Sequence, residues 1–210
     1  MKRIQKILII MSLTIVTLLV LGLILHFASP YLPYRCSRRP SENEMTLRLQ
    51  VVSTAESWLG AQEGSENHKA IIDRYNTHEP LAQGYAVTYE DNWCATFGSM
   101  VAISCGLTDI IPTECGCERQ IGLFQDLGRW EEKDTYLPQP GDYIYYAWDE
   151  YAVGDCTGWA DHVGIVAGTW GPFIKVIEGN KDDSVSYRYI TRWDLDIRGY
   201  GLPDYASKSA

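Results

Sequence analysis

The stretch DNWCATFGSMVA, residues 91–102, passes from a polar loop into a helical pattern. The pattern is a stripe of side chains at Cys94, Phe97, Val101 and Cys105. We predict a helix here, with Asp91 or Asn92 as its N-cap and Gly106 as its stop. Cys94 then lies in the first turn, where free backbone N–H groups and the helix dipole favour a thiolate.

Helices are also predicted before and after this stretch. Helical spacing and cap residues indicate one from about Glu44 to Leu59, one over Ser65–Tyr75 and one over Cys117–Leu127. After Gly141 the pattern changes to β-rich runs, at 143–148, 162–167, 173–178 and 186–192. Helices followed by strands predict a single α+β domain, with a hairpin between the second and third strands.

Two of the strand segments carry groups suited to activating a thiol. His162 begins the apolar run in ADHVGIV, residues 160–166, so one ring nitrogen can serve Cys94 as a general base. Glu178 ends the next run, in VIEGN at 176–180, and a hairpin brings its carboxylate to the second ring nitrogen. Taken singly, Cys94 is typical of a buried small hydrophobe and Glu178 of a solvated carboxylate. The three in this order favour a catalytic triad.

Together with QPGDYIYY at 139–146, these segments resemble the CHAP family of cysteine amidohydrolases and peptidases, relatives of the NlpC/P60 enzymes. The resemblance extends from about Glu44 to Tyr205. Its motifs are Trp-Cys-Ala at 93–95, Pro-Gly-Asp at 140–142, Asp-His-Val-Gly at 161–164 and Glu-Gly-Asn at 178–180.

This resemblance implies a papain-like fold, with N-terminal helices packed on an antiparallel sheet, and hydrolysis of amide bonds in bacterial peptidoglycan. The enzyme would be a stem-peptide endopeptidase or an N-acetylmuramoyl-L-alanine amidase, and the sequence does not separate the two. The resemblance makes Cys94 the nucleophile and His162 the base. Glu178 orients the imidazole, and Asn180 is a further polar member of the site.

Two other functions are compatible with the sequence. One is a papain-like amidase or transferase acting on another extracellular amide. The other is a non-catalytic wall-binding module, although such a module has no reason to keep a base beside a thiol. Aromatic rings suit sugars and peptide stems, and we predict that Trp93 and Trp159 bind substrate.

The N-terminal segment predicts a membrane anchor. Residues 7–27 carry no charged side chain, and as a helix they extend roughly 32 Å, enough to cross a bilayer core. A cleavable signal peptide is the alternative, but its apolar region is normally shorter. We therefore expect a cytoplasmic tail at 1–6, a single span at 7–27, a linker at 28–43 and an extracytoplasmic domain at 44–210.

The charge of the chain argues against a nucleic-acid partner. None of the 27 acidic residues and three of the 18 basic ones precede residue 28, so the remainder carries a net charge of −12. Such a domain repels nucleic acid. Some members of the family bind calcium through closely spaced aspartates, which this chain lacks before Cys94, so we predict no metal, no cofactor and no obligate protein partner. Whether Cys105, Cys115, Cys117 and Cys156 form disulfides, bind a metal or stay free is open.

Overall fold

The chain forms two units in a computed structural model, Met1–Arg39 and Pro40–Ala210. The structure describes residues 15–18, 20, 40–133, 135–148 and 158–208. Residues 15–18 and 20 are helical, and the rest of the anchor predicted at 7–27 lies outside the described residues. Within those described ranges, no helix combines the length and the apolar character that a membrane span requires.

The second unit begins with helices. Their bounds are α2 (Glu42–Glu56), α3 (Glu66–Asn76), η2 (Ala82–Gly84), α4 (Cys94–Cys105) and α5 (Cys117–Asp126), with α6 (Tyr205–Lys208) near the C-terminus. The four helices predicted from the sequence are confirmed. Helix α2 begins inside the stretch predicted as a linker, because the Ser41 side chain accepts a hydrogen bond from the Glu44 N–H and caps the helix.

The strands form one antiparallel sheet in the order β1-β6-β2-β3-β4-β5, which confirms the α+β class. Their bounds are β1 (Trp130–Glu131), β2 (Tyr143–Tyr146), β3 (His162–Trp170), β4 (Phe173–Lys181), β5 (Ser184–Thr191) and β6 (Ile197–Gly201). The predicted hairpin is present, because β3 and β4 pair up to Trp170 and Phe173 on either side of the turn.

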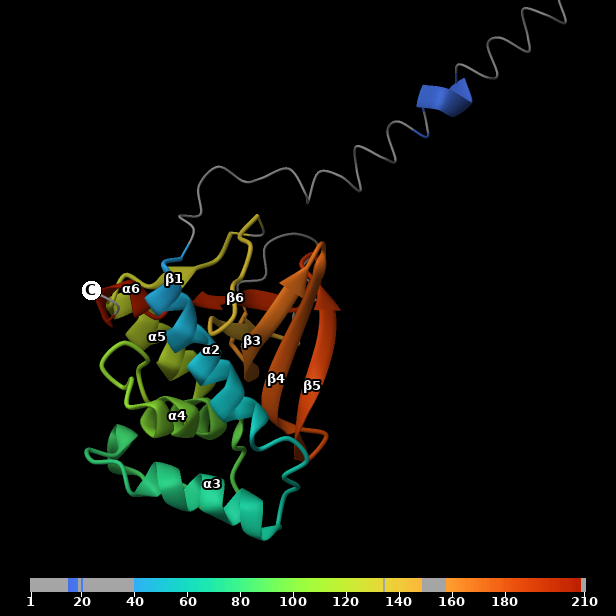
Figure 1. The fold of residues 1–210 in the computed structure, drawn as a ribbon. Helices are drawn as coiled ribbons and strands as arrows, with labels where there is room; N and C mark the ends of the chain where they lie inside the picture. The colour runs from blue at the N-terminus through green and yellow to red at the C-terminus, as the bar shows by residue number, and fades with distance from the viewer. Residues whose placement is uncertain (1–14, 19, 21–39, 134, 149–157, 209–210) are drawn as a thin grey trace, which may run out of the picture. The chain divides into compact units, whose positions relative to one another are not determined.

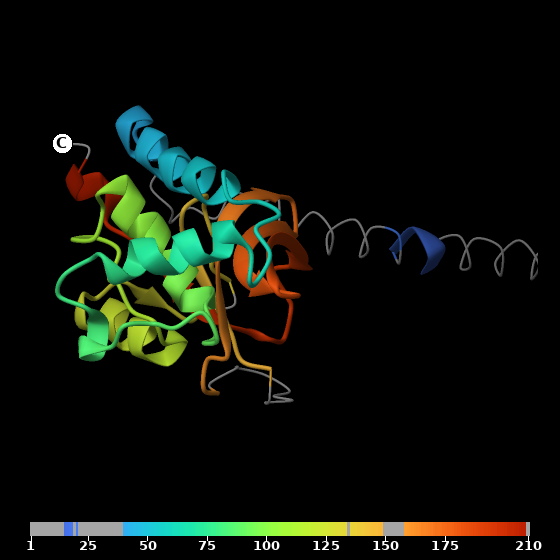
Figure 2. The same cartoon turned by 90° about the horizontal axis from the view of Figure 1, so that it is seen from below.

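Helix α4 lies directly against the sheet, where it contacts β3 and β4. Figures 1 and 2 show the helices gathered on one side of β3, β4 and β5. Two glycines permit the close approach. A Cβ on Gly98 would lie 2.9 Å from the Tyr143 ring, and a Cβ on Gly179 would lie 2.4 Å from Cβ of Phe97. The start of α4 is thereby fixed relative to the strands that carry His162 and Glu178.

The Pro-Gly-Asp motif ties helix α2 to the sheet. Asp142 is fully buried and accepts hydrogen bonds from Arg48 Nη1 at 2.8 Å, the Gln139 N–H at 2.8 Å and the Tyr136 hydroxyl at 2.7 Å. The Arg48 guanidinium also stacks over the Tyr205 ring, 4.6 Å from its centroid. The role of this motif is therefore structural.

Candidate active site

Cys94 is the first residue of α4, and its side chain is almost fully buried. The predicted N-cap is wrong, because Trp93 holds that position without a side-chain cap bond. The Asp91 carboxylate is engaged within its own loop, where it accepts from the N–H and hydroxyl of Thr88 and from the Tyr85 hydroxyl. The first N–H groups of α4 are therefore left without a capping side chain beside the thiol.

His162 and Glu178 meet at the same end of the β3–β4 hairpin, as predicted. Nε2 of His162 lies 3.1 Å from Oε2 of Glu178, and both side chains are buried. Gly164 makes room for this contact, because a Cβ there would lie 2.5 Å from Cγ1 of Val176 and 2.7 Å from Cγ of Glu178. The glycine of the Asp-His-Val-Gly motif is thus a steric requirement of the contact between His162 and Glu178.

Arg188 of β5 is a member of the site that sequence reasoning missed. Its Nε donates to both oxygens of Glu178, at 2.7 Å and 3.0 Å. The strand register pairs Glu178 with Ser186 and Val176 with Arg188, so the arginine reaches the carboxylate diagonally. No motif signals this residue, because its role depends on the register of β4 against β5.

The imidazole is also held from its face by Trp148. The two rings stack with centroids 5.1 Å apart and an interplanar angle of 27°. Asp161 supports this arrangement, because its carboxylate accepts from the Trp148 N–H at 2.7 Å. Glu178 therefore fixes one ring nitrogen of His162 while Trp148 fixes the plane of the ring.

The pKa values describe a charged pair. Burial alone would lower the pKa of His162, but its hydrogen bonds to Cys94 and Glu178 outweigh burial and raise it to about 9. Burial would raise the pKa of Glu178, but hydrogen bonds from His162 and Arg188 lower it. Because Glu178 occupies Nε2, the ring nitrogen that serves Cys94 is Nδ1.

The thiol of Cys94 has a second neighbour, which is Cys117 at the start of α5. The two sulfurs lie 3.5 Å apart. The hydrogen bond from Cys117 and then the contacts with His162 lower the pKa of Cys94 well below its ordinary value, against the effect of burial. The pKa of Cys117 is raised well above its ordinary value by the same bond and by burial. Cys94 is therefore the thiolate of the pair, and Cys117 the thiol that donates to it.

The remaining predicted site residues fall in different places. Asn180 lies beside the start of α4, where its Nδ2 contacts Oδ1 of Asn92 at 3.4 Å. Trp93 is 0% exposed, packs against His68 and Phe97 and donates to Glu63. We correct its assignment from a substrate wall to a core residue, because no part of its ring reaches the surface. Trp159 is 76% exposed, and its role in substrate binding stays a prediction.

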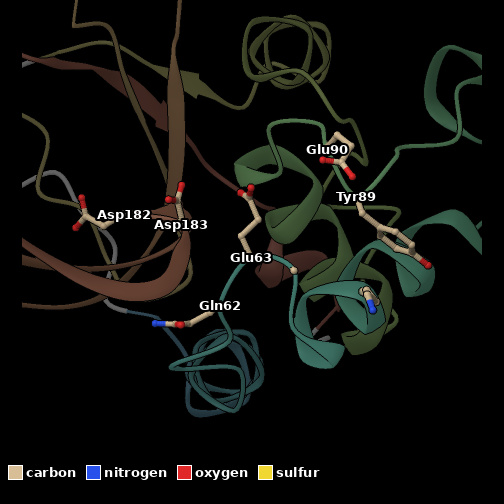
Figure 3. A pocket seen from close by; sticks show the side chains of 8 residues that line it. Gln62, Glu63, Tyr89, Glu90, Asp182 and Asp183 are labelled. Carbon is tan, nitrogen blue, oxygen red and sulfur yellow. The ribbon is translucent and has the colours of Figure 1, made fainter.

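A pocket opens next to the loop that precedes Cys94. Its lining comes from Gln62, Glu63, Gly64, Lys69, Tyr89, Glu90, Asp182 and Asp183. Figure 3 shows Asp182 and Asp183 on one side, Glu90 and Tyr89 on the other, and Glu63 between them. Four carboxylates against one ammonium group make this pocket electronegative.

Among the described residues, no cluster of three or more histidine, cysteine or acidic side chains is arranged to hold a metal ion. Cys94, Cys105, Cys115 and Cys117 are all free thiols. Cys36 and Cys156 lie outside the described residues.

Comparisons with known proteins assign neither a family nor a function. No family model matches the chain, and no curated protein matches it. The chain is similar to a solved structure, the crystal structure of Ly7917, with 14% sequence identity and a TM-score of 0.37. The match covers 74% of this chain and 62% of that one, so it spans less than two thirds of the other chain's length.

Proposed function

We propose that the chain is a cysteine amidohydrolase of the papain-like, CHAP type that cleaves amide bonds of bacterial peptidoglycan. The observation that carries the proposal is the buried connection from Cys94 through His162 to Glu178, with 3.1 Å between the imidazole and the carboxylate. A thiolate beside an oriented imidazolium is the arrangement that acyl transfer by a cysteine requires.

In this mechanism the Cys94 thiolate attacks the carbonyl carbon of the substrate amide. The imidazolium of His162 then gives the proton on its Nδ1 to the leaving amine, and the S-acyl enzyme forms. The neutral imidazole then takes a proton from water, the water oxygen attacks the S-acyl carbon, and the C–S bond breaks to release the acid and restore the Cys94 thiolate beside the imidazolium. The backbone N–H of Cys94, at the uncapped start of α4, is suited to receive the oxyanion. Glu178 and Arg188 act throughout by holding the imidazole in place.

The proposal includes a place of action. An uncharged run at residues 7–27 anchors the chain in a bacterial cell membrane, and residues 44–210 act on wall outside it. The exposed Trp159 contributes binding surface for the glycan or the stem peptide. Protease added to intact cells tests this placement, because it digests an outward-facing domain and leaves an inward-facing one whole.

The activity is tested by incubating the full chain, in mild detergent, with purified cell walls. Turbidity and new amino groups are followed for the wild type, Cys94→Ala and Cys105→Ala. The proposal predicts release by the wild type and Cys105→Ala, and none above background by Cys94→Ala. Equal release by Cys94→Ala and the wild type contradicts it. Mass spectra of the products identify which amide is cut.

A further inference from the structure

Cys94 and Cys117 form a pair of sulfurs that simple hydrolysis does not require. They are 23 residues apart in the chain, lie 3.5 Å apart in space and each begin a helix. Cys94 is 6% exposed and Cys117 is 8% exposed, so both sulfurs are largely shielded from solvent.

The fold holds these two helix starts together. The Ser99 hydroxyl of α4 donates to the Glu114 carbonyl at 2.7 Å and accepts from the Glu114 N–H at 2.8 Å. Gln120 of α5 donates to the Pro112 carbonyl at 2.8 Å. The loop that leads into Cys117 is therefore hydrogen-bonded to the same helix that carries Cys94. These hydrogen bonds fix the distance between the two sulfurs.

We propose that Cys94 and Cys117 form a reversible disulfide when the chain reacts with a peroxide, and that this bond inactivates the site by blocking the Cys94 nucleophile. A disulfide needs a sulfur separation of about 2.05 Å, so the two sulfurs must approach by roughly 1.5 Å. The bond itself goes beyond the proposed hydrolase function. Only its effect on amide cleavage rests on that function.

The chemistry balances with one peroxide as the oxidant. The Cys94 thiolate attacks one oxygen of hydrogen peroxide, the O–O bond breaks, and Cys94 becomes a sulfenic acid while hydroxide leaves. The Cys117 sulfur then attacks the Cys94 sulfur, the S–O bond breaks and the S–S bond forms. The hydroxyl lost from sulfur takes the proton of the Cys117 thiol and leaves as water, and the hydroxide from the first step takes a proton from solvent to become the second water. Two thiols lose two electrons, the peroxide gains them, and two waters are produced.

The roles of the two cysteines follow from their surroundings. Cys94 contacts the His162 imidazolium and is the reactive thiolate, whereas Cys117 is a protonated donor toward it. Cys117 therefore acts as the resolving thiol, which captures the sulfenic acid before further peroxide converts it to the irreversible sulfinic form. Dithiothreitol reduces the disulfide and restores both thiols.

The test uses the full chain in mild detergent, treated with a small molar excess of hydrogen peroxide and then with N-ethylmaleimide. Digestion with a glutamate-specific protease separates residues 91–114 from residues 115–118. We expect these two peptides to be linked, and the link to be lost on reduction. Cys115→Ser keeps the link and Cys117→Ser abolishes it. A Cys94 sulfinic acid beside an alkylated Cys117 in the wild type overturns the proposal, and so does a link that survives in Cys117→Ser.

A second measurement follows alkylation of Cys94 by iodoacetamide. Peroxide lowers this rate by roughly tenfold or more in the wild type, and dithiothreitol restores it, because a disulfide sulfur is not a nucleophile. In Cys117→Ser, dithiothreitol restores little of the alkylation rate that peroxide removed. If Cys117→Ser does not fold, the link in the wild type and in Cys115→Ser decides the matter. If the disulfide forms but the chain cleaves no cell wall, the disulfide proposal stands and the hydrolase proposal fails. If the chain cleaves cell wall but the disulfide never forms, the hydrolase proposal stands and the disulfide proposal fails.

Discussion

Gly164 and Glu178 face each other across β3 and β4 so closely that a Cβ on Gly164 would lie 2.7 Å from Cγ of Glu178. The carboxylate passes over this glycine on its way to His162. The absence of a side chain at Gly164 in β3 therefore allows Glu178 of β4 to reach the His162 imidazole.

Gly164→Ala is expected to displace Glu178 from His162. We predict a loss in amide cleavage of roughly tenfold to a hundredfold, because misplacing an orienting group by a fraction of an ångström is costly. The free energy of unfolding falls by about 1–3 kcal/mol through overpacking. Gly168→Ala in the same strand is the control, because a Cβ there has no atom within 4 Å. Equal activity of the two variants contradicts the steric role of Gly164.

Arg188 is predicted to act through Glu178 as a positioning residue. Arg188→Met removes both hydrogen bonds to the carboxylate, so kcat falls by roughly tenfold with little change in KM. The pKa of Glu178 rises, so the acid limb of the pH profile shifts toward neutral pH. Arg188→Lys keeps the charge and restores part of the rate. Arg192→Met, beyond the end of β5, is the control. An unchanged pH profile in Arg188→Met would show that the arginine is only structural.

The pH dependence follows from the two shifted groups. Thiolate and imidazolium coexist above the lowered pKa of Cys94 and below the raised pKa of His162, which is about 9. Amide cleavage is thus expected to hold through neutral pH and to decline as pH rises through about 9, because the proton for the leaving amine is lost.

Alkylation of Cys94 with iodoacetamide checks the acid side of this prediction. Because the pKa of Cys94 is lowered well below its ordinary value, alkylation in the wild type is expected to stay fast at pH values where an ordinary thiol is protonated, and His162→Gln lowers the rate there by roughly tenfold or more. Cys105 is an internal control, because burial raises the pKa of its thiol and it reacts only in alkaline solution. If Cys94 reacts with the same pH dependence as Cys105, then Cys94 is not a thiolate at neutral pH and the proposed mechanism is wrong.

Asp142 tests the structural role of the Pro-Gly-Asp motif. Asp142→Asn removes one of the two carboxylates that pair with the Arg48 guanidinium and leaves Glu44 as the other, which costs about 1–3 kcal/mol of unfolding free energy. Denaturant unfolding measures this cost, and Asp126→Asn on the exposed face of α5 is the control, within about 0.5 kcal/mol of wild type. The Cys94 alkylation rate of the folded variant stays at the wild-type value. A normal stability with a lost alkylation rate would instead make Asp142 a site residue.

The features that the sequence predicts are those with local signals. Helix α3 begins at the capping Ser65, and the turn at Gly171-Pro172 marks the hairpin. That hairpin is also why the pairing of His162 with Glu178 was predictable, since adjacent strands in a hairpin bring their outer ends together.

The features that the sequence misses depend on contacts between distant segments. Strand β6 escaped prediction because Gly199 and Gly201 break its apolar alternation, yet Trp130 and Phe124 fill the space that side chains there would need. Asp91 looked like a helix cap, but the Thr88 and Tyr85 donors hold its carboxylate in the loop. Cys117 joins the site only because the loop before α5 is fastened to α4.

Detection of a covalent intermediate on Cys94 tests the proposed mechanism most directly. The full chain is mixed with soluble peptidoglycan fragments, quenched in acid within one turnover and digested with a glutamate-specific protease. We expect residues 91–114 to gain the mass of the acyl group, fragmentation to locate it on Cys94, and Cys94→Ala to form neither adduct nor product. Product formation without an adduct, or with the acyl group on Cys105, would contradict it.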